Sequence, residues 1–91
     1  MFARVETFDT EPSQLDELIT AQQHATGRVR TMNGNMGGYV LCDRDHGRVL
    51  SVTFWQSEDD RAVAESEFEA SPHRGEVALY GIAMQQSLRP A

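Results

Sequence analysis

Arg4 and Glu6 are the first pair of side chains in this sequence whose types and spacing could do chemistry. They are two residues apart, so in an extended strand both lie on one face. A cation and a carboxylate on a buried face are costly to desolvate unless they pair with each other or with a ligand. The pair is therefore a candidate site if its face is enclosed and an ordinary solvated pair if it lies at a sheet edge. Both readings stay open, because Phe2 and Phe8 flank it on the same face.

Aromatic and imidazole side chains supply the other candidates. Trp55 ends an alternating segment and could stack on a flat aromatic ligand, although a tryptophan is often simply packed in a core. Tyr39 and Tyr80 offer phenol hydroxyls to a ligand oxygen. His73 follows a proline and could act as an acid or base at a cavity mouth, because imidazole titrates near neutral pH. The candidate catalytic residues are thus Tyr80, His73 and Arg4, and the candidate substrate-binding residues are Trp55, Glu6 and Tyr39.

The sequence gives no support for a metal site or a bound cofactor. His24, His46 and His73 are scattered and lack the spacing of metal ligands. The single cysteine, Cys42, excludes an internal disulfide, and no neighbouring base would activate it, so we expect a small buried residue there. Gly37-Gly38 lacks the strand and helix context of a phosphate-binding loop. We therefore predict neither a metal nor a cofactor.

Length and charge limit the classes of function. The chain has 91 residues, which suits one domain over residues 1–91. Its formal net charge of −6 disfavours binding to nucleic acid, because phosphate backbones repel it. The first residues do not resemble a signal peptide, and no apolar run approaches the length of a membrane span. We expect a cytoplasmic protein with no membrane association that binds a small molecule.

Hydrophobic periodicity predicts four strands and two helices. Strands show alternation and β-branched or aromatic residues, whereas helices show apolar residues three and four apart. The first helix begins near Pro12, and the second begins after the capping Ser57 with its three following acids. The predicted strands are 2–8, 39–42, 48–55 and 77–88, and the predicted helices are 12 to about 31 and 57 to about 71.

This order is the ferredoxin-like β-α-β-β-α-β arrangement of the α+β class, a four-stranded antiparallel sheet with two helices on one face. In strand 48–55 we expect Leu50, Val52 and Phe54 to face the helices. The alternate set, which ends at Trp55, then faces a cavity or a partner. Because helices cannot cover the second face, we predict a homodimer in which two sheets face each other. A monomer with a partly wet sheet is the alternative.

The segment from Gly47 to Asp60, which reads GRVLSVTFWQSEDD, resembles the antibiotic biosynthesis monooxygenase superfamily. In that family a strand ends in Trp and is followed by a polar residue, Ser and an acidic helix start. The glycine-containing loop from Asn33 to Gly38 also resembles the family's loop, and the likeness covers roughly residues 2–88. It implies a dimeric α+β barrel. Family activities include cofactor-independent quinone-forming oxygenases, heme-degrading oxygenases and lactone isomerases.

The resemblance leaves three functional hypotheses. The first is a cofactor-independent monooxygenase that acts on a small aromatic or polyketide-type substrate, and the second is a non-catalytic ligand-binding barrel. The third, an isomerase or decarboxylase, needs a general base, for which Glu6 is the candidate. Heme degradation is disfavoured, because the family's heme-degrading branch has a histidine where this chain has Ala64 to Ser66, and an asparagine where it has Glu6 or Thr7.

Overall fold

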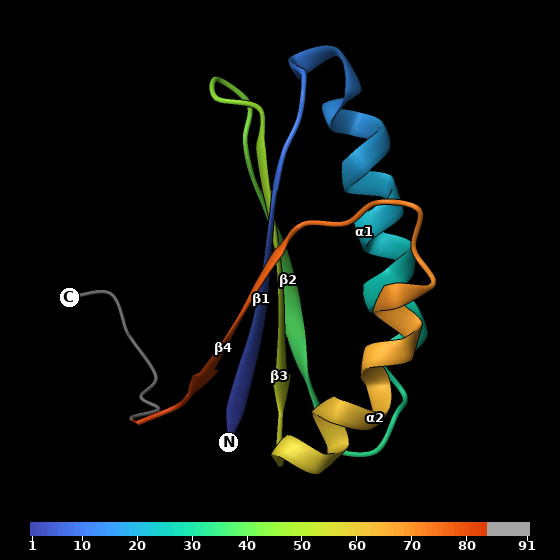
Figure 1. The fold of residues 1–91 in the computed structure, drawn as a ribbon, viewed down its shortest axis with the longest axis vertical. Coiled ribbons are helices and arrows are strands. Elements are labelled where there is room, and N and C mark those ends of the chain that lie inside the picture. Colours follow the sequence, from blue (N-terminus) through green and yellow to red (C-terminus); the bar gives the residue numbers. More distant parts are fainter. Residues whose placement is uncertain (84–91) are drawn as a thin grey trace, which may run out of the picture.

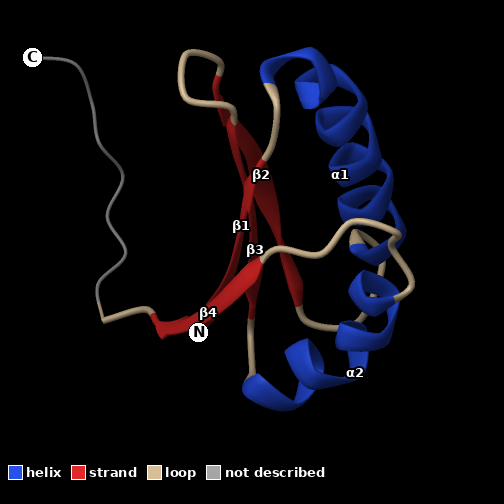
Figure 2. Ribbon diagram, turned by 45° about the horizontal axis from the view of Figure 1, so that its top comes forward, coloured by secondary structure: helices blue, strands red, loops and turns tan. Residues whose placement is uncertain are grey.

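The fold is the predicted β-α-β-β-α-β arrangement, seen in a computed structural model that describes residues 1–83. The strands pair antiparallel in the order β2-β3-β1-β4. Both helices lie on one face of the sheet, and no helix of the described residues covers the other (Figures 1 and 2). The elements are β1 (Phe2–Asp9), α1 (Leu15–Val29), β2 (Asn35–Asp43), β3 (Arg48–Trp55), α2 (Glu58–Glu69) and β4 (Glu76–Gly81).

Element boundaries follow local signals with a few differences from the prediction. A short 3-10 helix at Pro12–Gln14 precedes α1, so the α-helix proper begins three residues after the proline. The Ser57 hydroxyl accepts a hydrogen bond from the Asp60 amide at 3.1 Å and caps α2, as predicted. The sequence predicts a last strand over 77–88, whereas β4 is Glu76–Gly81; residues 84–88 lie outside the described part of the chain.

Strand β2 begins earlier than predicted because it contains an irregularity. Its pairing with β3 shifts register between Asn35 and Gly38, and Gly37 has a φ of 101°. A side chain at Gly38 would overlap the carbonyl oxygen of Val52. The glycines therefore let an edge strand run on through a bulge where ordinary residues would end it.

The predicted orientation of β3 is wrong. Val49, Ser51, Thr53 and Trp55 are buried against the helices, whereas Leu50, Val52 and Phe54 lie on the open face. The antiparallel register places the first set beside Arg4, Glu6 and Phe8 of β1, which also face the helices. Both faces of β3 carry apolar residues, so hydrophobicity alone could not assign them.

A layer of polar side chains divides the core between the sheet and the helices. One apolar cluster contains Ala25, Val29, Trp55, Ala64 and Phe68, and the other contains Phe8, Leu15, Leu18 and Val49. The buried polar residues on the same side of the molecule are Arg4, Glu6, Gln22, Ser51 and Thr53. Because buried polar groups need hydrogen-bond partners, the partners of these five residues decide whether the layer is purely structural or is open to a ligand.

The open face of the sheet is largely apolar. Cross-strand pairs place Tyr39 beside Val52 and Leu41 beside Leu50, and the rings of Tyr39 and Phe54 meet edge to face at 6.2 Å. Tyr39 and Leu41 are 63% and 49% exposed. In addition, no helix within residues 1–83 is long and apolar enough to cross a membrane.

Candidate functional site

Arg4 lies inside the molecule and is held by two carboxylates. Its guanidinium donates to Glu6 at 3.0 Å and to both oxygens of Glu65 at 2.9 and 3.0 Å. It also lies over the ring of Phe68, 3.9 Å from the centroid. Arg4 is 2% exposed and Glu6 is 6% exposed, so the pair is buried between the sheet and the helices rather than solvated at a sheet edge.

Further charged residues of α2 surround Arg4 and its partner Glu65. Arg61 donates to Glu65 at 3.0 Å and also pairs with Glu58. Partial burial raises the pKa of Glu65, but the hydrogen bonds and charges of Arg4 and Arg61 lower it by more, so its pKa lies below the ordinary value. We call Arg4, Glu6, Arg61 and Glu65 the Arg4 cluster. It joins β1 to α2. Because Glu6 and Glu65 occupy the guanidinium of Arg4, no side of it is free to bind another carboxylate.

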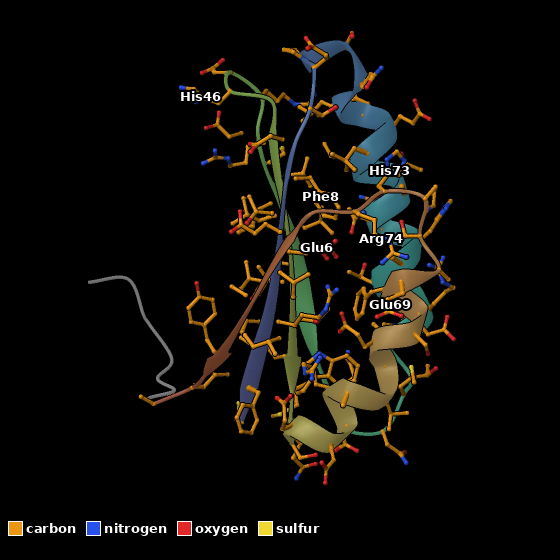
Figure 3. The ribbon with its side chains drawn as sticks, viewed as in Figure 1. Glu6, Phe8, His46, Glu69, His73 and Arg74 are labelled. Carbon is orange, nitrogen blue, oxygen red and sulfur yellow. The ribbon has the colours of Figure 1, made fainter. Side chains whose placement is uncertain are left out.

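Glu6 also ties down the connector that follows α2. Its second oxygen accepts a hydrogen bond from the backbone amide of Gly75 at 2.7 Å. In Figure 3, Glu6 and Phe8 point from β1 toward the helices. A side chain at Gly75 would overlap the carbonyl oxygen of Thr7, so only glycine allows the connector this close to β1. Glu6 is therefore engaged by Arg4 and Gly75, which makes it a poor general base.

Trp55 is part of the core rather than a wall of a cavity. Its exposure is 0%, and it packs in the cluster with Val29 and Phe68. Its indole N–H donates to the hydroxyl of Thr53 at 2.9 Å. Since the Thr53 oxygen accepts this bond, its own proton is still available to another acceptor. Trp55 thus orients Thr53 and does not present its face to a ligand.

Two buried polar atoms in the layer of polar side chains have no hydrogen-bond partner among residues 1–83, the Gln22 side-chain nitrogen and the Ser51 hydroxyl. Both residues are almost completely enclosed, with exposures of 1% and 0%. Such groups in native proteins usually meet an ordered water or a ligand atom. Between α1 and β3, therefore, the buried polar groups are less completely hydrogen-bonded than elsewhere in the described interior.

The six predicted site residues do not converge on one cavity. Arg4, Glu6 and Trp55 lie between sheet and helices, whereas Tyr39 and Tyr80 belong to the opposite face, with exposures of 63% and 56%. His73 is half-buried in the connector after α2, beside Arg74 (Figure 3).

The remaining titratable candidates are surface residues. His24 is exposed, and His46 lies in the β2–β3 hairpin, where its ring nitrogen contacts the Asp43 carboxylate at 2.7 Å. That hydrogen bond lowers the pKa of Asp43. Cys42 is exposed, so the prediction of a buried cysteine is wrong; it lies on the edge strand β2, where no other element of residues 1–83 covers it. Residues 1–83 contain no group of three or more His, Cys, Asp or Glu that could hold a metal.

A hollow lies between α1 and the start of β2, and we call it the α1–β2 pocket. Its volume is about 380 Å³, within the usual range for small-molecule sites. Its lining includes Thr26, Gly27, Arg30, Asn35, Tyr39 and Thr53. Of the residues predicted from the sequence only Tyr39 is among them. The signals that could have found the pocket are the Asn33–Gly38 loop and the glycine inside the first helix.

Gly27 has no packing reason to be glycine. It lies in the interior of α1, where glycine costs about 1 kcal/mol relative to alanine. A Cβ added there would meet nothing within 4 Å, and its φ is not in the left-handed region. The residue instead forms part of the pocket wall. A larger side chain at this exposed position would extend into the open space beside the pocket wall.

Comparisons with known proteins agree with this architecture. A proposed antibiotic biosynthesis monooxygenase from Deinococcus radiodurans superposes with a TM-score of 0.77 at 13% identity, covering 99% of this chain and all of that one. One from Nitrosomonas europaea gives 0.76 at 11% identity, covering 94% and 93%. The heme-degrader MhuD of Mycobacterium tuberculosis gives 0.72 at 16% identity, covering 96% and 100%. Likeness at these identities shows the fold.

The family assignment comes from the sequence match. No curated protein matches the chain. The family model described as antibiotic biosynthesis monooxygenase matches residues 1–73, which include β1, α1, β2, β3 and α2. That match, together with the four-stranded sheet and its two helices, shows that this chain belongs to the antibiotic biosynthesis monooxygenase family.

Proposed function

We propose that this protein is an oxygenase that binds a small aromatic or polyketide-type molecule in the α1–β2 pocket and needs no cofactor. The observation that carries the proposal is the pocket itself. It has the volume of a small-molecule site and a helical glycine in its wall, and its lining includes Thr53, whose hydroxyl proton is unused by the described residues. Family membership supports the reaction class, since the similar structures bear the name monooxygenase.

The chemistry suits a substrate that supplies its own electrons. An anthrone-type CH₂ group loses a proton to give a stabilised carbanion, which reacts with O₂. One oxygen atom becomes the new C=O, and the other leaves as water with the two hydrogens of the CH₂ group. The Thr53 hydroxyl would donate to the developing oxyanion, a role for which a prepositioned donor is effective. Trp55 is then a positioning residue, because its indole N–H orients that hydroxyl.

A non-catalytic binding role is the second candidate. Among residues 1–83, no carboxylate or imidazole lines the α1–β2 pocket, so none of them is an evident general base there. A substrate that loses its proton without a protein base is compatible with the oxygenase hypothesis. A ligand that does not ionise in this way favours the non-catalytic binding role. Binding without consumption of O₂ distinguishes the two. Glu6, the base that an isomerase would need, is held by Arg4 and Gly75.

The described residues do not fit a heme. The interior between β1 and α2 is filled by the Arg4 cluster, and the residue that packs inward on α2 ahead of Phe68 is Ala64. The three histidines lie on the outer surface of α1, in a hairpin turn and in the connector after α2. We therefore propose no step through heme, although the similar MhuD structure holds two hemes in its active site.

Filling the pocket tests the site and the reaction together. The purified protein should consume O₂ with members of a panel of anthrones and electron-rich phenols. Gly27→Leu should abolish this activity, because the added side chain enters the pocket. Gly27→Ala should raise the free energy of unfolding by about 0.5–1 kcal/mol and keep activity. Oxygen-electrode rates and thermal melts measure both effects.

The panel also has a clear negative result. If wild type binds members of the panel without turning any of them over, and Gly27→Leu abolishes this binding, the non-catalytic binding role replaces the oxygenase. Unchanged turnover in Gly27→Leu would place the reaction elsewhere.

We also propose that two copies pair through their open sheet faces. The support is the apolar character of that face, where Tyr39, Leu41 and Tyr80 are each about half exposed or more. Contiguous exposed patches of this kind usually mark an interface. No helix of the described residues lies on this face of the four-stranded sheet, so a second sheet can pack on it.

Light scattering coupled to gel filtration should give twice the chain mass of 10.2 kDa. Val52→Asp places a charge at the centre of the open face and should give the single-chain mass without unfolding the protein. The matched control is Val63→Asp on the exposed surface of α2, which should keep the double mass, since Val63 is 69% exposed. A wild-type mass of one chain would contradict the pairing.

A further inference from the structure

Arg30 differs from the other arginines in the described part of the chain. Carboxylates pair with both arginines of the Arg4 cluster and with Arg28, Arg44 and Arg48. Arg74 donates to the Glu69 carbonyl oxygen at 2.9 Å. Within residues 1–83, Arg30 has no hydrogen bond or ion pair. It has no such partner although the whole chain carries 14 acidic and 8 basic residues. Its free guanidinium is therefore unusual in this molecule.

The place of Arg30 makes the free guanidinium informative. It follows the last residue of α1 and lines the α1–β2 pocket, where it is the only charged residue among the described residues of the lining. The other polar groups of the lining are hydroxyls and amides such as those of Thr26, Asn35 and Thr53. A pocket with one cation and no acid presents a positive potential to a ligand, in a protein whose net charge is −6.

Neighbouring groups leave Arg30 free to bind. The side-chain oxygen of Asn35 accepts from the Gly37 amide at 2.9 Å, and the Thr26 hydroxyl donates to the Gln22 carbonyl oxygen at 2.9 Å. These bonds hold two walls of the pocket in place without involving the guanidinium. A helix C-terminus favours a cation, but Arg28 already serves this end of α1, where it pairs with Glu67.

We propose that the α1–β2 pocket selects an anionic aromatic ligand, one that carries a carboxylate or an ionised phenol, and that Arg30 binds this group. The inference rests on the proposed function, because it assumes that this pocket is the ligand site. A guanidinium matches a carboxylate with two parallel N–H···O bonds, so geometry as well as charge favours such a group. The aromatic ring then lies along the wall that Gly27 leaves open.

The test compares two probes that share a ring system and differ in charge, 2-naphthoate and 2-naphthamide. Isothermal titration at low salt should show naphthoate binding about tenfold more tightly than the amide, as a charge-assisted pair provides. Arg30→Gln should remove this preference and leave amide binding unchanged, and Arg30→Lys should restore part of it. Arg28→Gln makes the same change in net charge outside the pocket and should keep the full preference. Thermal melts show that each variant is folded.

The outcomes separate this inference from the proposed function. If naphthoate and naphthamide bind wild type equally, or if Arg28→Gln and Arg30→Gln weaken naphthoate by the same factor, Arg30 acts only on general charge or on the helix end. The anion selectivity is then overturned while the pocket stands. If Gly27→Leu leaves the binding of both probes unchanged, the pocket itself is overturned and this inference with it.

Discussion

Replacing Trp55 with alanine is expected to lower the free energy of unfolding by about 3–5 kcal/mol. Trp55 has no exposed surface and fills the space between β3 and the two helices, against Val29, Ala64 and Phe68. Removal of the indole leaves a cavity that this small core cannot close. The loss is a large fraction of the total stability of a domain this size. Urea unfolding followed by circular dichroism measures it, because the variant has no tryptophan to report fluorescence.

Trp55→Phe is the matched control. It keeps an aromatic ring in the core but removes the N–H that binds Thr53, so we expect a much smaller loss. All samples need equal protein concentration, because the dimer that we propose would make stability concentration-dependent. If Trp55→Ala instead abolished ligand binding and left stability within about 1 kcal/mol of wild type, the residue would be a stacking surface and not a core residue.

Replacing Arg4 with methionine is expected to cost about 3–5 kcal/mol, because it leaves two carboxylates close together with no cation between them. Glu6 is the more deeply enclosed of the two, with 8% of its side chain exposed. The guanidinium also loses its contact with the Phe68 ring. The comparison variant is Arg48→Met, which breaks an exposed pair with Asp9 and should cost at most about 1 kcal/mol.

Two further measurements identify the cause. Adding Glu6→Gln to Arg4→Met removes one charge and should recover part of the loss. The folded-state pKa of Glu65 is lowered, so its pairing stabilises the protein above pH about 4.3 and the contribution disappears as pH falls through the lowered pKa. The difference in free energy of unfolding between wild type and Arg4→Met should therefore become smaller in acid. If this difference is already small at neutral pH, the result would contradict a buried ion network.

Most of the architecture was predictable because local signals agreed with one another. The alternation in 48–55, the capping Ser57 with its acids and the proline before α1 each define an element independently of the rest of the fold. Boundaries were less predictable. The bulge that extends β2 back to Asn35 depends on a close approach of Gly38 to Val52 on another strand. No local pattern reports such a contact.

The candidate site was less predictable than the fold. Arg4 and Glu6 stood out as a pair, but the second partner of Arg4 is Glu65, which is 61 residues away. Arg30 carries no chemical signature in the sequence, and Gly27 is marked only as a glycine inside a predicted helix. They gain meaning only because α1 packs beside the start of β2.

By itself, the sequence determined the order of elements, the family and the fact that a sheet face would lack helices, since these depend on periodicity and turn chemistry along short stretches. Tertiary structure alone decided which face that is. A strand with apolar residues on both sides takes its orientation from its neighbours, and pairing with β1 turned Trp55 inward and Val52 outward. That choice moved the candidate ligand site from the open face to the space beside α1, because side-chain direction in a sheet is a property of the register.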